Sequence, residues 1–213
     1  MNHASLYSLD EKLSSILQRM QDRLMSKSTY WGIPTLKNPV DFWVYQEIIY
    51  SIKPDYIIEI GNYMGGSTLA FAHMLENLNN GRVIGLDVDH SKISNLVSKH
   101  PRIELIEEDA KNSVGRVKDL IPENSNVLVI EDSSHDFDHT LEIIRLYSPL
   151  VSVGSYLIVE DGICRHGLDV GPEPGPYEAT VEFLKECQEF EIDSSREDFV
   201  ITWNPCGYLK RIR

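Results

Sequence analysis

The chain is short of cysteine and of long apolar runs, and both shortages narrow the kinds of protein it can be. Its 213 residues hold only Cys164, Cys187 and Cys206, with no Cys-x-x-Cys pair. An odd number without paired spacing argues against a disulfide framework and favours a reduced chain. No apolar run approaches the ~20 residues that cross a bilayer, and no apolar signal core opens the chain. We therefore expect a cytoplasmic protein that does not enter a membrane.

Positive charge is also scarce. The chain has 20 lysines and arginines but 33 aspartates and glutamates, which gives a formal net charge of −13. Such a surface repels nucleic-acid phosphates and anionic lipid headgroups, so neither is an expected partner. The one basic cluster, Lys210, Arg211 and Arg213, is typical of a solvated strand end. A hydrophobic content of 42% with 25% charged residues is ordinary for a folded globular chain.

Apolar residues at spacings of three and four open the chain and predict an amphipathic helix. Packing of this helix on its own domain is one interpretation, and the alternatives are a homo-oligomer contact or a cover over a pocket. A broken aromatic segment follows, and then a second helix with Asp41 as candidate N-cap. We expect residues 1–40 to belong to the same unit as residues 41–213. The residues of the first apolar pattern are Leu6, Leu9, Leu13, Ile16, Leu17, Met20 and Leu24.

From residue 56 onward, short apolar strands alternate with helices in units of roughly 25 residues, which is typical of a parallel sheet with right-handed crossovers. The fold class predicted is therefore α/β, with a doubly wound, mostly parallel, seven-stranded sheet and a C-terminal antiparallel hairpin. The hairpin is expected at residues 199–204 and 207–212. The parallel strands are expected at residues 56–61, 82–89, 103–110, 126–132 and 154–162, and the helices between and after them at 67–78, 91–100, 114–120, 139–150 and 178–190.

A glycine-rich turn follows the first of these strands but lacks the G-x-G-x-x-G spacing of a dinucleotide site, because Tyr63 takes the place of the second glycine. The carboxylate just before the turn suits a ligand with an amino group better than a pyrophosphate. Acids at the next two strand ends suit ribose hydroxyls and an adenine. This series favours S-adenosylmethionine as cofactor, with Glu59, Gly61, Gly65, Ser67, Asp87 and Asp109 as candidate binding residues.

Carboxylates also end the fourth and fifth parallel strands, at Asp132 and at Glu160 and Asp161. If these strands are neighbours, about 4.8 Å apart, the three groups converge and repel one another unless a cation lies among them or one is protonated. An all-oxygen cluster favours Mg²⁺, or another hard ion such as Mn²⁺ or Ca²⁺, over zinc. Solvated strand ends or helix caps are the alternative interpretation.

His135 follows Asp132 by three residues and is the candidate catalytic base. A divalent ion lowers the pKa of a hydroxyl that it binds, and a neutral histidine within reach removes the proton. Asp132 and His135 would then carry catalysis together. His139 forms a His-x-x-x-His pair with His135, so a transition-metal site is the rival interpretation.

Five segments together resemble the cephalosporin hydroxylase-like family: residues 30–49, 55–68, 127–139, 156–162 and 204–211, the last with the sequence NPCGYLKR. That family contains Mg²⁺-dependent class I O-methyltransferases that act on sugar hydroxyls of macrolides and on rhamnosyl groups. The resemblance implies metal ligands at Asp132, Glu160 and Asp161, a base at His135, and a mobile segment, residues 163–177, over the acceptor. The word hydroxylase suggests iron, but no two-histidine, one-carboxylate set is evident in the sequence.

We therefore expect an S-adenosylmethionine-dependent O-methyltransferase that methylates a hydroxyl of a small molecule or glycosyl group, as in natural-product biosynthesis. One alternative is a metal-independent methyltransferase acting on a phenol or an amine. The other is an inactive partner subunit that only binds the cofactor. The clustered carboxylates argue against loss of activity, because an inactive copy has no need of them.

Overall fold

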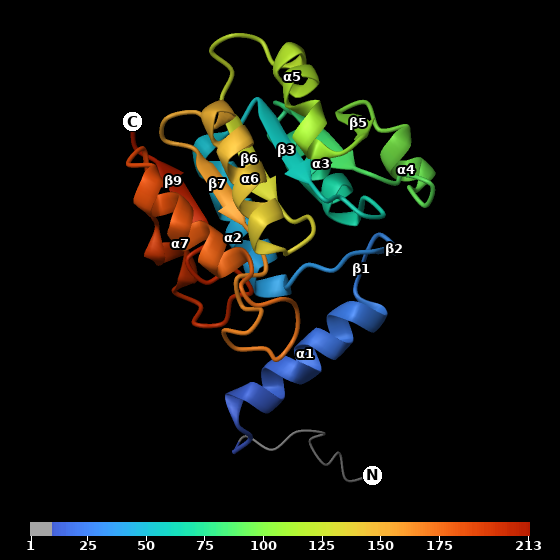
Figure 1. Cartoon of the computed structure of the whole chain (residues 1–213). Coiled ribbons are helices and arrows are strands. Elements are labelled where there is room, and N and C mark those ends of the chain that lie inside the picture. The colour runs from blue at the N-terminus through green and yellow to red at the C-terminus, as the bar shows by residue number, and fades with distance from the viewer. Residues whose placement is uncertain (1–9) are drawn as a thin grey trace.

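A seven-stranded sheet forms the centre of the computed structural model, which describes residues 10–213 (Figure 1). Its strand order is β5-β4-β3-β6-β7-β9-β8. The first five of these strands are mutually parallel, and β9 is antiparallel to both β7 and β8. The α/β sheet predicted from the sequence is thus confirmed. The strands are β3 Tyr56–Ile60, β4 Arg82–Asp87, β5 Ile103–Glu107, β6 Val127–Glu131, β7 Tyr156–Val159, β8 Phe190–Ile192 and β9 Tyr208–Arg211.

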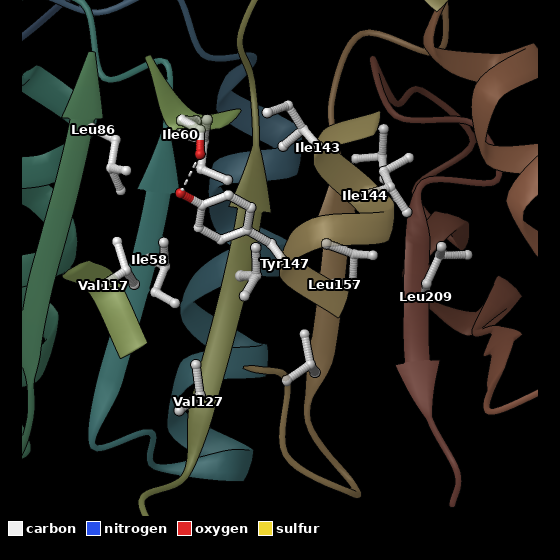
Figure 2. Close-up of a cluster of buried hydrophobic side chains, with 14 of the residues drawn as sticks. Ile58, Ile60, Leu86, Val117, Val127, Ile143, Ile144, Tyr147, Leu157 and Leu209 are labelled. Carbon is white, nitrogen blue, oxygen red and sulfur yellow. Dashed lines mark hydrogen bonds between the residues drawn. The ribbon is translucent and has the colours of Figure 1, made fainter. Parts of the chain in front are cut away.

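Helices cover both faces of the sheet, so the strands are apolar on both sides. Because side chains alternate along a strand, Ile58 packs into one apolar cluster and Ile57 into the other. Figure 2 shows the first cluster, in which Tyr147 of α6 lies over the sheet and donates a hydrogen bond of 2.9 Å to the carbonyl of Ala110. The helices on that face are α5 Ala110–Leu120, α6 Phe137–Tyr147 and α7 Pro176–Glu186, and those on the other are α2 Pro39–Ile52, α3 Gly66–Asn77 and α4 Asn95–Ser98.

The N-terminal helix α1, Leu13–Lys27, lies apart from the sheet in Figure 1 and packs against the loop that follows β7. Leu17 and Leu24 are buried against Leu168 and Trp203. Packing on its own chain is therefore what the structure shows for this helix. Two residues of the predicted pattern, Leu6 and Leu9, lie outside the described residues. A hairpin of two short strands, β1 Thr29–Tyr30 and β2 Ile33–Pro34, joins α1 to α2.

Two predicted elements were wrong in place or extent. Residues 199–204 are not a strand, and β9 pairs antiparallel with β7 and with β8, which ends seven residues before residue 199. Val200 is 81% exposed with φ +69, because this segment forms a turn instead of joining the sheet edge. Residues 91–100 contain only the four-residue α4, since Ser94 caps a helix that starts late and Pro101 follows it. Within residues 10–213, no helix combines the length and apolarity needed to cross a membrane.

Asp41 is not the N-cap of α2. Asn38 takes that role, and its side chain accepts a hydrogen bond from the Val40 N–H at 3.2 Å, with Pro39 at the first helical position. Asp41 is instead buried, and its carboxylate accepts hydrogen bonds from the Trp203 N–H at 2.8 Å and the Tyr208 hydroxyl at 2.8 Å. The Thr202 hydroxyl and the Asn38 amide donate to it as well. Asp41 therefore fastens the start of α2 to the segment before β9.

Replacement of Asp41 tests the strength of this link. We expect Asp41→Ala to lower the free energy of unfolding by about 2–3 kcal/mol, because buried donors at Trp203 and Tyr208 lose their acceptor. Urea unfolding followed by circular dichroism measures the change. Asp119→Ala, at an exposed position near the end of α5, is the matched control, with an expected change below about 0.5 kcal/mol. Equal losses in the two variants would contradict the role given to Asp41.

Candidate active site at the carboxyl ends of the strands

A cavity of about 540 Å³ lies beyond the carboxyl ends of the parallel strands. Its walls come from the loops after β3, β4, β5, β6 and β7, from the segment before α2 and from Gln21 and Met25 of α1. Besides packing on its own chain, α1 therefore also covers part of this pocket. The strand order reverses between β3 and β6, and doubly wound sheets bind ligands at such a point. The wall residues that the sequence analysis also singled out are Gly61, Ser67, Asp87, Asp109, Asp132, His135, His139 and Asp161.

The glycine turn after β3 fits closely against the loop after β6. Gly61 has φ +83, and a Cβ on it would lie 1.9 Å from the backbone oxygen of Asp132. Only glycine allows the two loops to approach so closely. Gly65, also with positive φ, precedes α3 but faces Val97 and does not line the cavity. The turn thus brings the predicted cofactor half and the predicted acidic cluster into contact.

Two acids of the predicted cofactor half line the cavity and also accept backbone hydrogen bonds. Asp87 accepts from the Tyr63 N–H at 2.7 Å, which holds Tyr63 at φ +48 in the turn. Asp109 caps α5 by accepting from the Lys111 N–H at 2.9 Å. Each carboxylate is therefore fixed in direction by the main chain while it faces the cavity.

Glu59, by contrast, is fully buried and does not line the cavity. Its Oε2 accepts a hydrogen bond from the Thr68 hydroxyl at 2.6 Å. Its Oε1 has no hydrogen bond and lies 3.9 Å from Lys37 Nζ. Burial raises the pKa of Glu59, and the Lys37 charge and the hydroxyls beside it act in the opposite direction. The Glu59 carboxylate therefore lies behind the cavity wall, and its contact with a cofactor stays a prediction.

Lys37 lies at the centre of the acidic cluster, although it was not among the residues predicted for the site. Its ammonium donates to Asp132 Oδ2 at 2.5 Å and to Glu160 Oε1 at 2.5 Å, with the side chain only 5% exposed. Burial alone would lower the pKa of Lys37, but Asp132, Glu160 and Glu59 raise it above its usual value. The pKa of Glu160 is raised well above its usual value by burial and by the neighbouring charge of Asp132. Lys37 thus carries the positive charge nearest to three carboxylates.

His135 faces the other side of Asp132. Its Nε2 lies 3.0 Å from Asp161 Oδ2 and 3.4 Å from Asp132 Oδ1. Burial would lower the pKa of His135, but hydrogen bonding and attraction to these two carboxylates raise it to about 11. His135 and Asp161 both have left-handed backbones, at φ +57 and φ +58. Such a conformation costs on the order of 1 kcal/mol per residue and persists where the surroundings enforce it.

Asp132, His135 and Asp161 together form a group that could hold a metal ion, because one ligand atom from each lies within 4.8 Å of the others. Glu160, predicted as a further ligand, turns its carboxylate to Lys37 instead. His139 lines the cavity but does not belong to this group. The predicted acids after β6 and β7 therefore do converge, with Asp132 contacting both Lys37 and His135.

A two-histidine, one-carboxylate set does exist in the fold, although it was not evident in the sequence. His73 and Glu76 of α3 meet His100 after α4, outside the cavity wall. His100 Nδ1 accepts a hydrogen bond from the Arg102 N–H at 3.2 Å, so the neutral ring carries its proton on Nε2. That atom faces Glu76 at 3.9 Å and then has no lone pair to offer an ion. The group is better explained as a polar contact between α3 and the loop after α4.

Asn62 and Glu108 also line the cavity and were missed. Glu108 directly precedes Asp109, so the acidic end of β5 could have included it. Asn62 directly follows Gly61 in the glycine turn, so its position next to that glycine could have indicated it. Lys37 had no comparable signal, because it sits in a segment without regular periodicity, 95 residues before Asp132.

Comparison with known proteins agrees with this architecture. The family model described as Rhamnosyl O-methyltransferase/CmcI matches residues 22–212. Rhamnosyl O-methyltransferase of Mycobacterium bovis is 33% identical over 195 residues, covering 87% of this chain and 79% of the relative. The enzyme of the same name from Mycobacterium leprae is 32% identical over 194 residues, covering 86% and 83%.

Solved structures show the same fold. A structure of CmcI with magnesium and S-adenosylmethionine matches with a TM-score of 0.68 at 21% identity, over 98% of this chain and 88% of that one. An O-methyltransferase from Bacillus cereus in complex with SAH matches with a TM-score of 0.58 at 17% identity, over 86% and 84%. Because the family model covers nearly the whole chain, this protein belongs to the Rhamnosyl O-methyltransferase/CmcI family of O-methyltransferases.

Proposed function

We propose that the protein transfers a methyl group from S-adenosylmethionine to a hydroxyl of a small molecule or glycosyl group, with a hard divalent ion, Mg²⁺, and His135 as base. The observation that carries the proposal is the contact of His135 with Asp132 and Asp161 at the wall of the cavity. The relatives named rhamnosyl O-methyltransferase support a deoxysugar hydroxyl as the acceptor.

The cofactor would lie over the glycine turn. The cavity volume of about 540 Å³ is within the range of small-molecule sites. Gly61 keeps the turn free of a side chain, Ser67 opens α3 beneath it, and Asp87 and Asp109 present carboxylate oxygens suited to hydroxyl and amino groups. Glu59 and Gly65 lie behind the cavity wall and would support the turn. Glu59 accepts a hydrogen bond from Thr68 of α3, and Gly65 packs against Val97.

The acidic cluster fits a hard divalent ion. Asp132, Glu160 and Asp161 supply carboxylate oxygens, and the buried Oε1 of Glu59 has no hydrogen-bond partner, so the cluster carries more negative charge than Lys37 balances. Asp132 and Asp161 line the cavity and would hold the ion; Glu160 is the remaining proposed ligand. A bound divalent ion supplies Lewis acidity, which lowers the pKa of a coordinated hydroxyl.

His135 is placed to receive the proton of the acceptor hydroxyl. It lines the cavity beside Asp132 and Asp161, so an oxygen near those carboxylates is within its reach. With a pKa of about 11 it is protonated at neutral pH and cannot act as a base. His135 becomes competent only when the negative charge of Asp132 and Asp161 is neutralised. The same carboxylates thus decide both the charge and the orientation of the imidazole.

Substitution of His135 tests its role as base. We expect His135→Asn to lower kcat by about 10²–10⁴-fold, because the proton acceptor is lost. Asparagine tolerates the left-handed backbone at φ +57, so the loop after β6 keeps its shape. Methyl transfer to a rhamnosyl glycoside measures kcat, and calorimetry with S-adenosylhomocysteine checks that the dissociation constant changes less than about threefold.

His139→Asn is the matched control for this measurement, because His139 lines the same cavity without contacting Asp132 or Asp161 in the structure. We expect it to retain most of the activity. A loss equal to that of His135→Asn would instead support the rival site built from the two histidines. Full activity of His135→Asn would remove the base from the proposal.

Metal addition tests the acidic cluster. We expect Mg²⁺ at about 100 times its dissociation constant to stabilise the folded protein by about 2.7 kcal/mol, since it binds the native carboxylates and not the unfolded chain. Thermal unfolding with and without the ion measures the shift. The double variant Asp132→Asn, Asp161→Asn is expected to lose it, whereas Asp119→Asn keeps it. Undiminished turnover after EDTA treatment would favour the metal-independent methyltransferase.

A further inference from the structure

The turn formed by residues 202–207, which includes the segment NPCG, runs beside the end of β7 and the loop that follows it. Trp203 of this turn lines the cavity, but the function proposed above gives Asn204 no role. Three oxygens of the turn accept hydrogen bonds from alternate backbone N–H groups, the first at the last residue of β7 and the next two in the loop. The Gly207 carbonyl accepts from the Val159 N–H at 2.9 Å, and the Trp203 carbonyl accepts from the Ile163 N–H at 3.0 Å. The middle acceptor is a side chain, because Asn204 Oδ1 accepts from the Asp161 N–H at 3.1 Å.

This arrangement continues the pairing of β7 with β9 past the end of both strands. The regular ladder ends with Ile158 opposite Tyr208. Beyond it the chain approaches too closely for any side chain at Gly207, where a Cβ would lie 2.1 Å from the Val159 carbonyl oxygen. The backbone of residues 204–207 then turns on itself, with the Gly207 N–H donating to the Asn204 carbonyl at 2.9 Å. That carbonyl is used within the turn, and the Asn204 amide oxygen supplies the acceptor for Asp161.

The Asn204 side chain is held in one orientation. It is 1% exposed, and its Nδ2 donates to the Tyr45 hydroxyl at 2.7 Å. The Tyr208 hydroxyl lies 3.4 Å from the same nitrogen. Because the amide nitrogen faces Tyr45 on α2, the amide oxygen must face the Asp161 N–H. Through Tyr45, the core below the sheet edge therefore directs the Asn204 amide oxygen toward the loop after β7.

We propose that Asn204 is a positioning residue that holds Asp161 in its left-handed conformation, so that the Asp161 carboxylate faces His135 and the proposed ion; this role rests on the function proposed above. Asp161 has φ +58 and its Oδ2 lies 3.0 Å from His135 Nε2. A left-handed backbone is disfavoured by about as much as one hydrogen bond stabilises. Besides the bond of 3.0 Å that the Asp161 carbonyl accepts from the Cys164 N–H, the bond from the Asp161 N–H to Asn204 offsets this cost. Without it the backbone at residue 161 relaxes and the carboxylate turns away from His135.

Two variants separate this role from a general loss of stability. Asn204→Leu has a similar size but removes both amide groups. Tyr45→Phe removes only the partner of Asn204 Nδ2 and leaves the acceptor for the Asp161 N–H in place. If Asn204→Leu does not fold, Asn204→Ser, whose shorter side chain does not reach Asp161, takes its place.

The first measurement is hydrogen exchange at the Asp161 amide in the metal-free protein. Protection in wild type and Tyr45→Phe, with at least about tenfold faster exchange in Asn204→Leu, is the expected result, because one acceptor protects this amide. Unchanged protection in Asn204→Leu, or equal loss of protection in Tyr45→Phe, would overturn the positioning role of Asn204. This readout does not depend on methyl transfer or on any ion.

The second measurement is binding of Mn²⁺, followed by electron paramagnetic resonance. We expect Asn204→Leu to weaken binding by about 10–100-fold, as loss of an outer partner of a metal ligand does elsewhere. Tyr45→Phe should stay within about threefold of wild type, and all variants should keep their affinity for S-adenosylhomocysteine. Wild-type affinity in Asn204→Leu overturns the positioning role. Absence of Mn²⁺ binding in the wild type itself overturns the proposed function. The exchange data distinguish that result from failure of the positioning role, because they report the Asp161–Asn204 hydrogen bond without any ion.

Discussion

The repulsion among carboxylates at one edge of the sheet is the constraint on which the rest of this site depends. Neighbouring parallel strands lie about 4.8 Å apart, so acids at the ends of β3, β6 and β7 cannot avoid one another. Glu59, Asp132 and Glu160 all approach the single ammonium of Lys37. Burying charges is costly unless they are paired, and removing one partner of such a group leaves the others uncompensated. The packing of Lys37 is therefore a condition for the fold as well as for the site.

Lys37 and Asp41 belong to the same short segment, and they fasten it at two points. Lys37 reaches the strand ends, and Asp41 accepts hydrogen bonds from Trp203 and Tyr208. Between them, Asn38 starts α2 as its cap. Through Trp203 this segment is also connected to α1, since the indole N–H of Trp203 donates to Gln21 at 2.8 Å. The irregular stretch before α2 thus joins the N-terminal helix, the acidic cluster and the turn before β9.

The parts of the fold that local patterns determine were predictable, and the parts that distant side chains determine were not. Continuous runs of branched apolar residues predict buried strands such as β6, and acids that follow them indicate the edge of the sheet at which ligands bind. The residues at 199–204 favour a strand by composition, yet the turn that carries Asn204 was selected by contacts with Asp41 and the loop after β7. Lys37 contacts Glu160, 123 residues away in the sequence, and Asn204 contacts Asp161, 43 residues away. Periodic patterns in a sequence do not predict contacts at such separations.

The charge balance of these side chains favours the divalent ion proposed above over a second lysine. Glu59, Asp132, Glu160 and Asp161 are four carboxylates, and Lys37 and His135 are the cations in contact with them. In the protein without an ion, the raised pKa of Glu160 favours uptake of a proton, which removes one excess negative charge. A divalent ion would offset two negative charges and favour loss of the protons on Glu160 and on His135, so its binding would relieve the same repulsion that opposes folding. A fixed third cation would remove the repulsion permanently, and with it the reason for an ion to bind.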